Sequence, residues 1–530
     1  MVGDGRGQGG VTTTAGPPAV PKVGLPASPA PPATRPGFLG RISAAAIVIS
    51  VLLMMAVTAA GPSAVVPQIP RTWPNPPLWF PLHPSQALVT AAVYAAIALG
   101  AAGVGLGLVA VWRGARPNLR LLAAGAVIAI IVLALLPPGG STDSLSYAAY
   151  GRIAVLGHDP YVMTPAQLRA TGDPIGLQST RNWAIDPSLY GPVGITADWM
   201  AAKLGGTSIS SIVFWLKLLF ALSFGAVALA LDRFWRGDPA ARARAHLLWT
   251  VNPLMLWAVI GGDHIDGLAA CLGFFGLLVA RTVTAGPGAR IPPARALAAG
   301  LLVGAAVAVK APYFPLALAL AWSCRNSVKA LAACAAGGAL AVVPGYLIAG
   351  PAAVKDLVVR SSNLVTFDSF WRLFYPPFGY AGMPRGLELL AVLACVAMAA
   401  LLAWRLPAGP AYPPAIRPAL ALMVAWLLVW PLQRPWYDAV AFCLLAVFQA
   451  SRLDWLMLIR AVPAAAAVAT GAANRHPRAL TQVIAFVGND LSPYVRLGAV
   501  IAAVALCALG AWELRRPRRG SLTVEPAAPS

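Results

Sequence analysis

Several of the few charged side chains in this sequence lie next to long apolar runs, where a charge is costly unless it has a partner or a function. Asp143 follows by only a few residues an apolar run that ends at Leu136. Lys310 lies between two apolar stretches, and Arg434 lies between two nearby tryptophans. A carboxylate in such a position can act as a general base. Lysine and arginine can bind an anionic group such as a phosphate.

Asp263, His264 and Asp266 form a second group of polar residues, at the start of another apolar run. A histidine flanked by two carboxylates can bind a divalent metal ion or the hydroxyl groups of a sugar. We favour hydroxyl binding, because one histidine with two aspartates is a small ligand set for a metal. The aspartates also have a structural interpretation, since aspartate is preferred where a helix begins.

The elements that must position these residues are apolar helices. Of the 530 residues, 58% are hydrophobic and 11% are charged, whereas about 25% of a typical soluble domain is charged. The mean hydropathy is +0.72. About 20 consecutive apolar residues cross the core of a bilayer as a helix. The sequence therefore predicts an all-α, polytopic integral membrane protein with about 12–14 transmembrane helices, and it excludes a soluble globular enzyme.

The predicted spans were located by hydropathy along the whole chain. Those with the length of a crossing helix, or nearly so, are Ile42–Ala60, Ala87–Trp112, Leu121–Leu136, Ile209–Leu231, Lys329–Gly350 and Arg496–Leu514. Others, several of them short enough to be broken or re-entrant helices, are Leu247–Ile260, Ile265–Ala280, Ala296–Val309, Pro312–Trp322, Leu387–Trp404, Pro418–Trp430, Asp438–Ala450 and Trp455–Gly471.

Basic residues are concentrated in alternate segments between these spans. An excess of lysine and arginine marks the cytoplasmic side of a membrane protein, so we expect both termini to be cytoplasmic. These residues account for most of the formal net charge of +21, and no basic face remains for a nucleic acid. The basic residues on the predicted cytoplasmic side include Arg113, Arg116, Arg120, Arg233, Arg236, Arg242, Arg244, Arg325 and Lys329.

The predicted spans also define the domain organisation. Residues 1–38 have almost no bulky apolar side chains and are predicted to be a disordered cytoplasmic tail. Residues 39–515 form the transmembrane domain, and residues 516–530 form a second cytoplasmic tail. Within the domain, residues 137–208 are the major extracytoplasmic loop, expected to be catalytic, and residues 351–386 are a second outer loop. The major loop is too rich in Pro, Gly and Asp to cross a membrane, but its Tyr, Trp and Leu content predicts a packed segment.

Two turn-forming sequences in the major loop could hold side chains over the helices. They are HDPY at 158–161 and YGP at 190–192, and proline, glycine and aspartate favour tight turns. We expect Asp159, Tyr161 and Tyr190 to face a bound ligand, and we interpret His158 as a turn residue.

Five segments together resemble a known family. They are TDSLSYAAYGRIAVLGHDPY (142–161), SLYGPVG (188–194), NPLMLWAVIGGDHIDGL (252–268), VKAPYFPL (309–316) and QRPWYD (433–438). In this order they are similar to the polyprenol-phosphomannose-dependent α-1,6-mannosyltransferases of actinobacteria, which are membrane glycosyltransferases of the GT-C type. Those enzymes build the mannan backbone of lipomannan-type lipoglycans. One segment departs from the family, since a His-Asn-Asp-like string is expected where this chain has Asp263-His264-Ile265-Asp266.

The resemblance implies an inverting transfer of mannose on the outer face of the plasma membrane. The donor would be a polyprenyl phosphomannose lipid and the acceptor a mannoside glycolipid, an α-1,6-mannan. A β-linked mannosyl phosphate would then give an α-mannoside in a single displacement. No cofactor is expected, and a divalent cation is possible but has no clear ligand set. The polyprenyl phosphate leaves as a stable anion, so a second, acidic carboxyl is less needed than in glycoside hydrolysis.

In this interpretation each candidate residue has a role. Asp143 is the general base, and Lys310, Arg434 and the weaker candidate Arg372 bind the donor phosphate. The candidates for sugar and acceptor binding are Asp159, Tyr161, Tyr190, Asp263, His264, Asp266, Trp436 and Tyr437.

Other interpretations stay open from the sequence alone. Asp143 can cap a helix or a turn, and Lys310 and Arg434 can extend their charges to the membrane interface. A secondary transporter or lipid-linked sugar translocator would also be polytopic, although transporters usually have duplicated halves and short loops. A scaffold protein would make no use of these three charges. ATP-driven transport is not expected, because no GxxxxGK[ST] phosphate loop occurs. The six cysteines form no CxxC pair, so neither a disulfide framework nor a zinc site is predicted.

Overall fold

The structure is a computed structural model. It describes residues 37–180, 183–282, 290–361, 365–366, 368–374, 383–407, 413–468 and 478–514. The chain divides into two units, Met1–Thr34 and Arg35–Ser530, and all described residues belong to the second. The predicted disordered tails therefore lie outside the described residues, except that the first helix already begins at Phe38. Among the described residues the regular structure is helical, apart from one isolated bridge between Ser451 and Glu513.

Six described helical segments are long and apolar enough to cross a membrane. They are α1 (Phe38–Ala59), α2 (Gln86–Trp112), α8 (Ile209–Phe234), the first part of α14 (Val328–Ser361), α15 (Arg385–Arg405) and the continuous stretch of α19 (Arg478–Ala485), η6 (Phe486–Leu491) and α20 (Ser492–Ala508). Each of these helices corresponds to an apolar run in the sequence that is long enough to cross a bilayer. The prediction of an all-α, polytopic membrane protein is confirmed.

Further apolar helices are shorter or bent. The stretch of α9 (Pro239–Ala245), η1 (His246–Thr250), α10 (Pro253–Met255) and η2 (Leu256–Gly261) meets α11 (Asp266–Val279) at 117°. The shorter ones are α3 (Leu119–Leu135), α12 (Pro293–Val309), η3 (Ala311–Tyr313) with α13 (Phe314–Cys324), α16 (Ile416–Val429) and η5 (Pro435–Tyr437) with α17 (Asp438–Val447). If the bent pair is one span and each of the five shorter apolar helices is another, the described residues contain twelve spans. Twelve is the lower end of the expected number.

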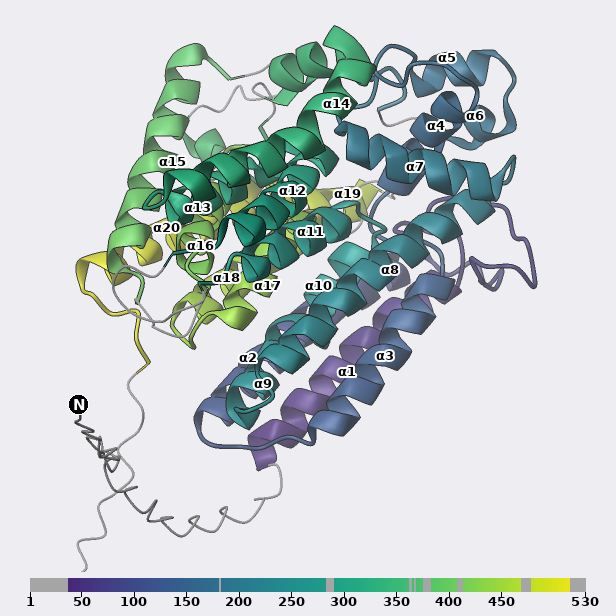
Figure 1. Cartoon of the computed structure of the whole chain (residues 1–530). Coiled ribbons are helices and arrows are strands. Elements are labelled where there is room, and N and C mark those ends of the chain that lie inside the picture. The colour runs from purple at the N-terminus through teal and green to yellow at the C-terminus, as the bar shows by residue number, and fades with distance from the viewer. Residues whose placement is uncertain are drawn as a thin grey trace, which may run out of the picture. The chain divides into compact units, whose positions relative to one another are not determined.

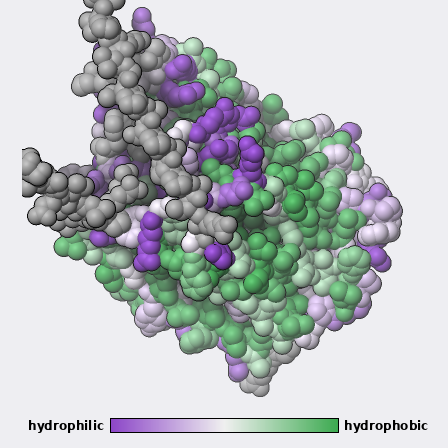
Figure 2. Space-filling model, turned by 90° about the horizontal axis from the view of Figure 1, so that it is seen from below, coloured by the Kyte–Doolittle hydropathy of each residue, from purple (hydrophilic) through white to green (hydrophobic). Residues whose placement is uncertain are grey.

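The surfaces of the long helices are apolar where they face outward. Only 11% of the apolar window of α14 and 17% of that of α15 is buried inside the structure. Outward-facing side chains include Leu340, Leu347 and Ile348 on α14 and Leu389, Leu393 and Val396 on α15. Figure 2 shows a face on which apolar residues form a broad, continuous surface. Such a surface is unfavourable in water and favourable against lipid.

The predicted major loop, residues 137–208, is a structured segment, and about half of it is helical. Its place outside the membrane stays a prediction. It contains α4 (Asp143–Val155), α5 (Pro165–Ala170), α6 (Pro174–Gln178) and α7 (Pro192–Gly205). Thr164 forms a capping box with Gln167 at the start of α5, and Asp173 caps α6. Proline is the first residue of α5, α6 and α7, a position that tolerates it because the missing N–H would have no partner there. The predicted packing of this segment is confirmed.

These short helices gather at one end of a group of long ones. In Figure 1, α1, α2, α3 and α8 run side by side, with α4 to α7 near the start of α8 and α9 near its end. Close packing of α4 on α7 requires Gly151, because a Cβ there would lie 2.2 Å from the carbonyl oxygen of Asp198. The helical segment 143–205 is thus held as a packed layer at one end of these helices.

The basic segments that we expect to be cytoplasmic partly come together. α9 contacts α2, so the basic residues after α2 and those of α9 share one end of the helices. Arg244 differs from the others, because it is buried and forms an ion pair with Asp454 at 2.5 Å. The side of the membrane on which this end lies stays a prediction. The second predicted outer loop, residues 351–386, contains the end of α14 and η4 (Phe370–Leu373), and part of it lies outside the described residues.

Candidate active site

Asp143 is the first residue of α4, and its side chain is 17% exposed. No side chain caps the start of α4, so the capping interpretation of Asp143 finds no support in the structure. Its backbone N–H donates to Oγ of Ser141 at 3.1 Å. Its Oδ2 lies 3.7 Å from Nε2 of His264. The carboxylate lies at the positive end of a helix, which favours its charged form.

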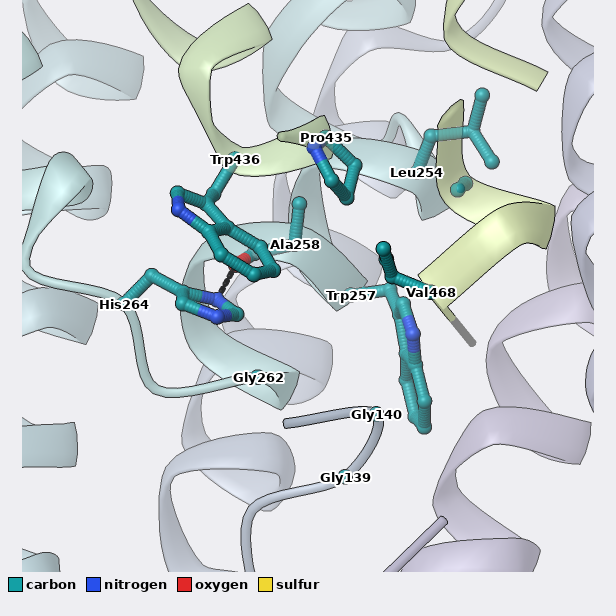
Figure 3. Close-up of a pocket in the computed structure, with 11 residues that line it drawn as sticks. Gly139, Gly140, Leu254, Trp257, Ala258, Gly262, His264, Pro435, Trp436 and Val468 are labelled. Carbon is teal, nitrogen blue, oxygen red and sulfur yellow. Dashed lines mark hydrogen bonds between the residues drawn. The ribbon is translucent and has the colours of Figure 1, made fainter. Parts of the chain in front are cut away.

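His264 lies in the turn between η2 and α11. Its Nδ1 is 2.6 Å from the carbonyl oxygen of Ala258, and its ring stacks on Trp436 with centroids 3.6 Å apart and planes at 17°. Figure 3 shows the stacked pair and the bond to Ala258. A carbonyl oxygen can only accept, so Nδ1 carries the hydrogen. Nε2 has no hydrogen-bond partner in the described part of the chain.

Lys310 lies between the apolar helices α12 and η3, and its backbone is extended, with a φ of −156°. Its Nζ lies 2.7 Å from Oδ2 of Asp266, whose side chain is fully buried. The same Nζ lies 4.6 Å from the ring centre of Tyr437 and 5.5 Å from that of Tyr190. The hydroxyl of Tyr313 donates to the backbone carbonyl of Asp266 at 3.0 Å. The charge of Lys310 is thus compensated by Asp266 and lies between two aromatic rings.

Arg434 precedes η5 and is half-buried. Its guanidinium lies 6.0 Å from the ring centre of Trp436. Within the described residues its side chain makes neither a hydrogen bond nor an ion pair. Unlike Lys310, Arg434 therefore has a charge that is available to a ligand.

The charges around Asp143 act on its titration. Burial raises the pKa of Asp143, and the positive charges of Lys310 and Arg434 oppose this rise without cancelling it. A carboxyl with a raised pKa is a stronger proton acceptor than an exposed one, provided that it is ionised at the working pH. The site therefore combines a basic carboxylate, a guanidinium without an ion-pair partner in the described part of the chain, an ammonium group paired with a carboxylate, and stacked rings.

A buried arginine binds both ends of the QRPWYD segment. Arg460 of α18 (Leu453–Val468) is 1% exposed and forms an ion pair with Asp438. Its Nη2 donates to Oε1 of Gln433 at 2.6 Å. The Nε2 of Gln433 donates to the carbonyl oxygens of Trp426 and Trp430 at 2.7 and 2.9 Å. Gln433 and Asp438 thus anchor a segment whose intervening residues line the site. Sequence reasoning missed Arg460, although a positive charge within an apolar run was its signal.

Asp263 belongs to a separate buried group with Asp198 of α7 and Lys217 of α8. All three are fully buried, and Asp263 has a positive φ of 58°. Neither carboxylate has a hydrogen-bond partner within the described residues, and Nζ of Lys217 donates to the carbonyl oxygen of Pro137 at 3.3 Å. No side chain caps α11, so the capping interpretation of Asp263 and Asp266 is not supported. Sugar binding by Asp263 stays a prediction.

The structure places three other candidates as follows. Asp159 is exposed, and its Oδ1 accepts from the backbone N–H of Tyr161 at 2.8 Å, as a turn residue does. Tyr161 is buried in a hydrophobic cluster that includes Ile195 and Ala353, distinct from the main core. Arg372 is half-buried on η4, which packs against α20. Their roles in ligand binding stay predictions.

A small cavity of about 20 Å³ adjoins the stacked pair of His264 and Trp436 (Figure 3). It is mainly apolar and is lined by Gly139, Gly140, Leu254, Trp257, Ala258, Gly262, His264, Pro435, Trp436, Ala465 and Val468. Among the described residues, no three His, Cys, Asp or Glu side chains gather as a metal site would require. The metal independence expected from the sequence stays a prediction.

Comparison with known families identifies related sequences. The model of the family described as alpha-(1->6)-mannopyranosyltransferase, N-terminal domain, matches residues 45–326, more than half of the chain. This range contains Asp143, His264 and Lys310 and ends before Arg434.

Individual relatives align over shorter stretches. A probable alpha-(1->6)-mannopyranosyltransferase of Mycolicibacterium smegmatis is 28% identical over 239 residues, which are 40% of this chain and 42% of that protein. Alpha-(1->6)-mannopyranosyltransferase B of Corynebacterium glutamicum is 28% identical over 150 residues, which are 28% of this chain and 24% of that protein. The chain thus aligns with less than half of the length of each relative.

Solved structures are less similar. The crystal structure of ArnT from Cupriavidus metallidurans bound to undecaprenyl phosphate is 15% identical, with a TM-score of 0.36, over 74% of this chain and 77% of that chain. The family model and the named relatives confirm the family resemblance predicted from the five sequence segments. The chain belongs to the alpha-(1->6)-mannopyranosyltransferase family.

Proposed function

We propose that this chain is a GT-C-type glycosyltransferase that moves mannose from polyprenyl phosphomannose to a mannoside acceptor, extending an α-1,6-mannan. One observation carries the proposal: the largely buried carboxylate of Asp143 interacts electrostatically with Lys310 and with Arg434, whose guanidinium has no ion-pair partner within the described residues. A base beside a phosphate-binding cation is what transfer from a sugar phosphate requires. Family membership supports mannose as the sugar.

In the proposed reaction, Asp143 takes the proton of the acceptor hydroxyl as its oxygen attacks the anomeric carbon. The bond between that carbon and the phosphate oxygen breaks, and the polyprenyl phosphate leaves with the electron pair. Arg434 binds the phosphate through a fork of N–H donors, and Lys310 adds a point charge. Tyr190 and Tyr437 provide aromatic faces for the sugar. Attack from the face opposite the phosphate inverts the anomeric centre.

The lipid donor agrees with the position expected for the site. Asp143 begins the first helix of the packed layer α4 to α7, at the end of the helices away from basic α9. We propose that this end is extracytoplasmic, following the excess of positive charge at the other. Nucleotide sugars are kept in the cytoplasm, so a site on the outer face needs a sugar that a lipid has already carried across.

Substitution of Asp143 tests the proposal. Asp143→Asn keeps the size of the side chain but cannot accept a proton, and loss of a general base costs on the order of 10²–10⁴ in rate. Asp238→Asn is a matched control, because Asp238 is an exposed cap of α9 and asparagine caps equally well. We expect the first variant to lose transfer at unchanged thermal stability and the second to keep it. Retention of more than about half of the activity by Asp143→Asn would exclude it as the base.

A further inference from the structure

We propose that Asp143 does not act alone, and that His264 accepts a hydrogen bond from Asp143 once Asp143 has taken the proton. The base would then be a carboxylate–imidazole pair that holds one proton between Oδ2 and Nε2. This inference rests on the proposed function, and it assigns His264 a positioning and proton-sharing role in place of direct sugar binding.

The structure fixes which nitrogen of His264 faces Asp143. The Nδ1–H donates to the carbonyl oxygen of Ala258 at 2.6 Å, so Nε2 carries the lone pair. The ring plane is fixed by the stack on Trp436, at 3.6 Å between centroids. Gly262 leaves the necessary space, because a Cβ at that position would lie 2.6 Å from Nδ1 of His264. The tautomer and the orientation of the ring are therefore both set by the surrounding backbone.

The two facing atoms are both acceptors in the resting state. Nε2 of His264 and Oδ2 of Asp143 lie 3.7 Å apart, too far for a hydrogen bond. Nε2 is buried and has no other hydrogen-bond partner within the described residues. A buried acceptor without a donor is unfavourable by about 1–3 kcal/mol. Protonation of Asp143 would supply the missing donor, and the two atoms, 3.7 Å apart at rest, would then approach by about 1 Å to form the hydrogen bond.

The proton is accounted for at each step. The O–H bond of the acceptor breaks, its electron pair forms the new bond to the anomeric carbon, and the proton goes to Oδ2 of Asp143. The Oδ2–H then donates to Nε2 of His264. The electron pair of the broken bond leaves on the polyprenyl phosphate. The shared proton is afterwards released to water, which restores the ionised carboxylate.

Charged and titratable groups on other elements face this pair. Lys310 forms an ion pair with Asp266, whereas the guanidinium of Arg434 has no ion-pair partner within the described residues. Burial of the ring disfavours a resting imidazolium. The positive charges of Lys310 and Arg434 act in the same direction against the opposing charge of Asp266, so His264 is neutral, as the proposal requires. The groups whose charges or hydroxyls act on the pair are Asp266, Lys310, Arg434, Tyr147, Tyr190 and Tyr437.

Two variants remove Nε2 and each keep a different structural contact of His264. His264→Phe keeps a ring that can stack on Trp436. His264→Asn keeps an amide N–H that can donate to Ala258. A purely structural role would be rescued by at least one of them, whereas loss of Nε2 is common to both. His83→Asn is a matched control, because His83 is exposed and has a φ of 47°, which asparagine tolerates.

The readout is kcat/KM against pH for the full-length protein with polyprenyl phosphomannose, and kcat and donor KM at the pH plateau. We expect both variants to lose on the order of 10² or more in kcat, with little change in donor KM. We also expect the acid limb to move to lower pH, because the acceptor that stabilises protonated Asp143 is gone. His83→Asn should match the parent.

Other results would overturn the proposal. If either folded variant keeps more than about half of the parent's kcat, or if the acid limb does not move, the pair does not exist. If one variant fails to fold, as judged by size-exclusion elution and thermal unfolding, the other decides. Asp143→Asn distinguishes failure of the proposed function from failure of the pairing between Asp143 and His264. Activity in that variant would refute the proposed function itself, whereas an inactive Asp143→Asn with unaffected His264 variants would refute the pairing alone.

Discussion

Removal of Lys310 should damage both stability and catalysis, for two separable reasons. Its Nζ lies 2.7 Å from Oδ2 of Asp266, whose side chain is fully buried. Lys310→Met keeps the length of the side chain but leaves that carboxylate without its ion-pair partner. Loss of one partner of a buried ion pair costs about 3–5 kcal/mol of unfolding free energy. We therefore expect a clearly lower thermal unfolding midpoint in detergent.

A second substitution separates the two effects. In Lys310→Met/Asp266→Asn no buried charge remains unpaired, so most of the lost stability should return. Transfer should not return, because the cation that we propose to bind the donor phosphate is still missing. Loss of one charge-assisted contact costs about 1.5–3 kcal/mol, which is about 10- to 140-fold in donor affinity.

The assay is thermal unfolding of purified variants, followed by initial rates at several donor concentrations. Lys329→Met is the matched control, because Lys329 is exposed. An unfolding midpoint of Lys310→Met equal to that of the parent would refute the reasoning about the buried pair. A donor KM equal to that of the parent in the double variant would refute a phosphate contact by Lys310.

Three further predictions follow from the site and the helices. Arg434→Ala should raise the donor KM about 10- to 140-fold without loss of stability, and measured donor saturation like that of the parent would contradict this. Burial raises the pKa of Asp143, and the base must be ionised, so activity should fall as the pH decreases through a value above the ordinary carboxylate range. Because the charge of Arg434 lowers this pKa, the acid limb of kcat/KM should move to still higher pH in Arg434→Ala. A topology reporter at Gly172 should be extracytoplasmic and one at Pro239 cytoplasmic, and reporters on the same side would overturn the proposed sidedness.

The membrane-spanning helices could be predicted because apolarity is a local property of the sequence. The predicted span Ile209–Leu231 corresponds to α8, Ile209–Phe234, whereas the last predicted span, Arg496–Leu514, begins later than the apolar stretch Ala479–Ala508. The helices of residues 137–208 were missed because their prolines were interpreted as loop residues. Pro165, Pro174 and Pro192 instead occupy the first turn of a helix, and Thr164 is a cap. Proline preceded by a capping residue is a helix start as well as a turn signal.

The gathering of distant site residues could be predicted only through the family resemblance. Asp143, His264, Lys310 and Trp436 come from segments that no local pattern connects. The order of the five segments, which matches the family, indicated that they belong to one site. It did not show which side chains contact one another or at what distances. That Lys310 is compensated by Asp266 could not be predicted, because it depends on the bend between η2 and α11.

The cost of a charge in an apolar helix also applies to two other buried cations, whose roles it could not predict. Lys217 within α8 and Arg460 within α18 lie in apolar runs, as Lys310 does. The cost of a charge in an apolar helix indicated that each needs a partner or a function. It could not distinguish Lys310, which faces the site, from Arg460, which anchors the QRPWYD segment through Gln433 and Asp438. That distinction depends on tertiary contacts.

The identity of the sugar donor tests the central claim most directly. Purified protein should extend a mannoside acceptor when supplied with polyprenyl phosphomannose in the absence of GDP-mannose, and Asp143→Asn should not. In membranes whose synthesis of the lipid donor is blocked, added GDP-mannose should not restore transfer. Robust transfer by the purified protein from GDP-mannose alone would contradict the account, because the proposed lipid-phosphate site of Arg434 and Lys310 on the outer face would then have no lipid donor to bind.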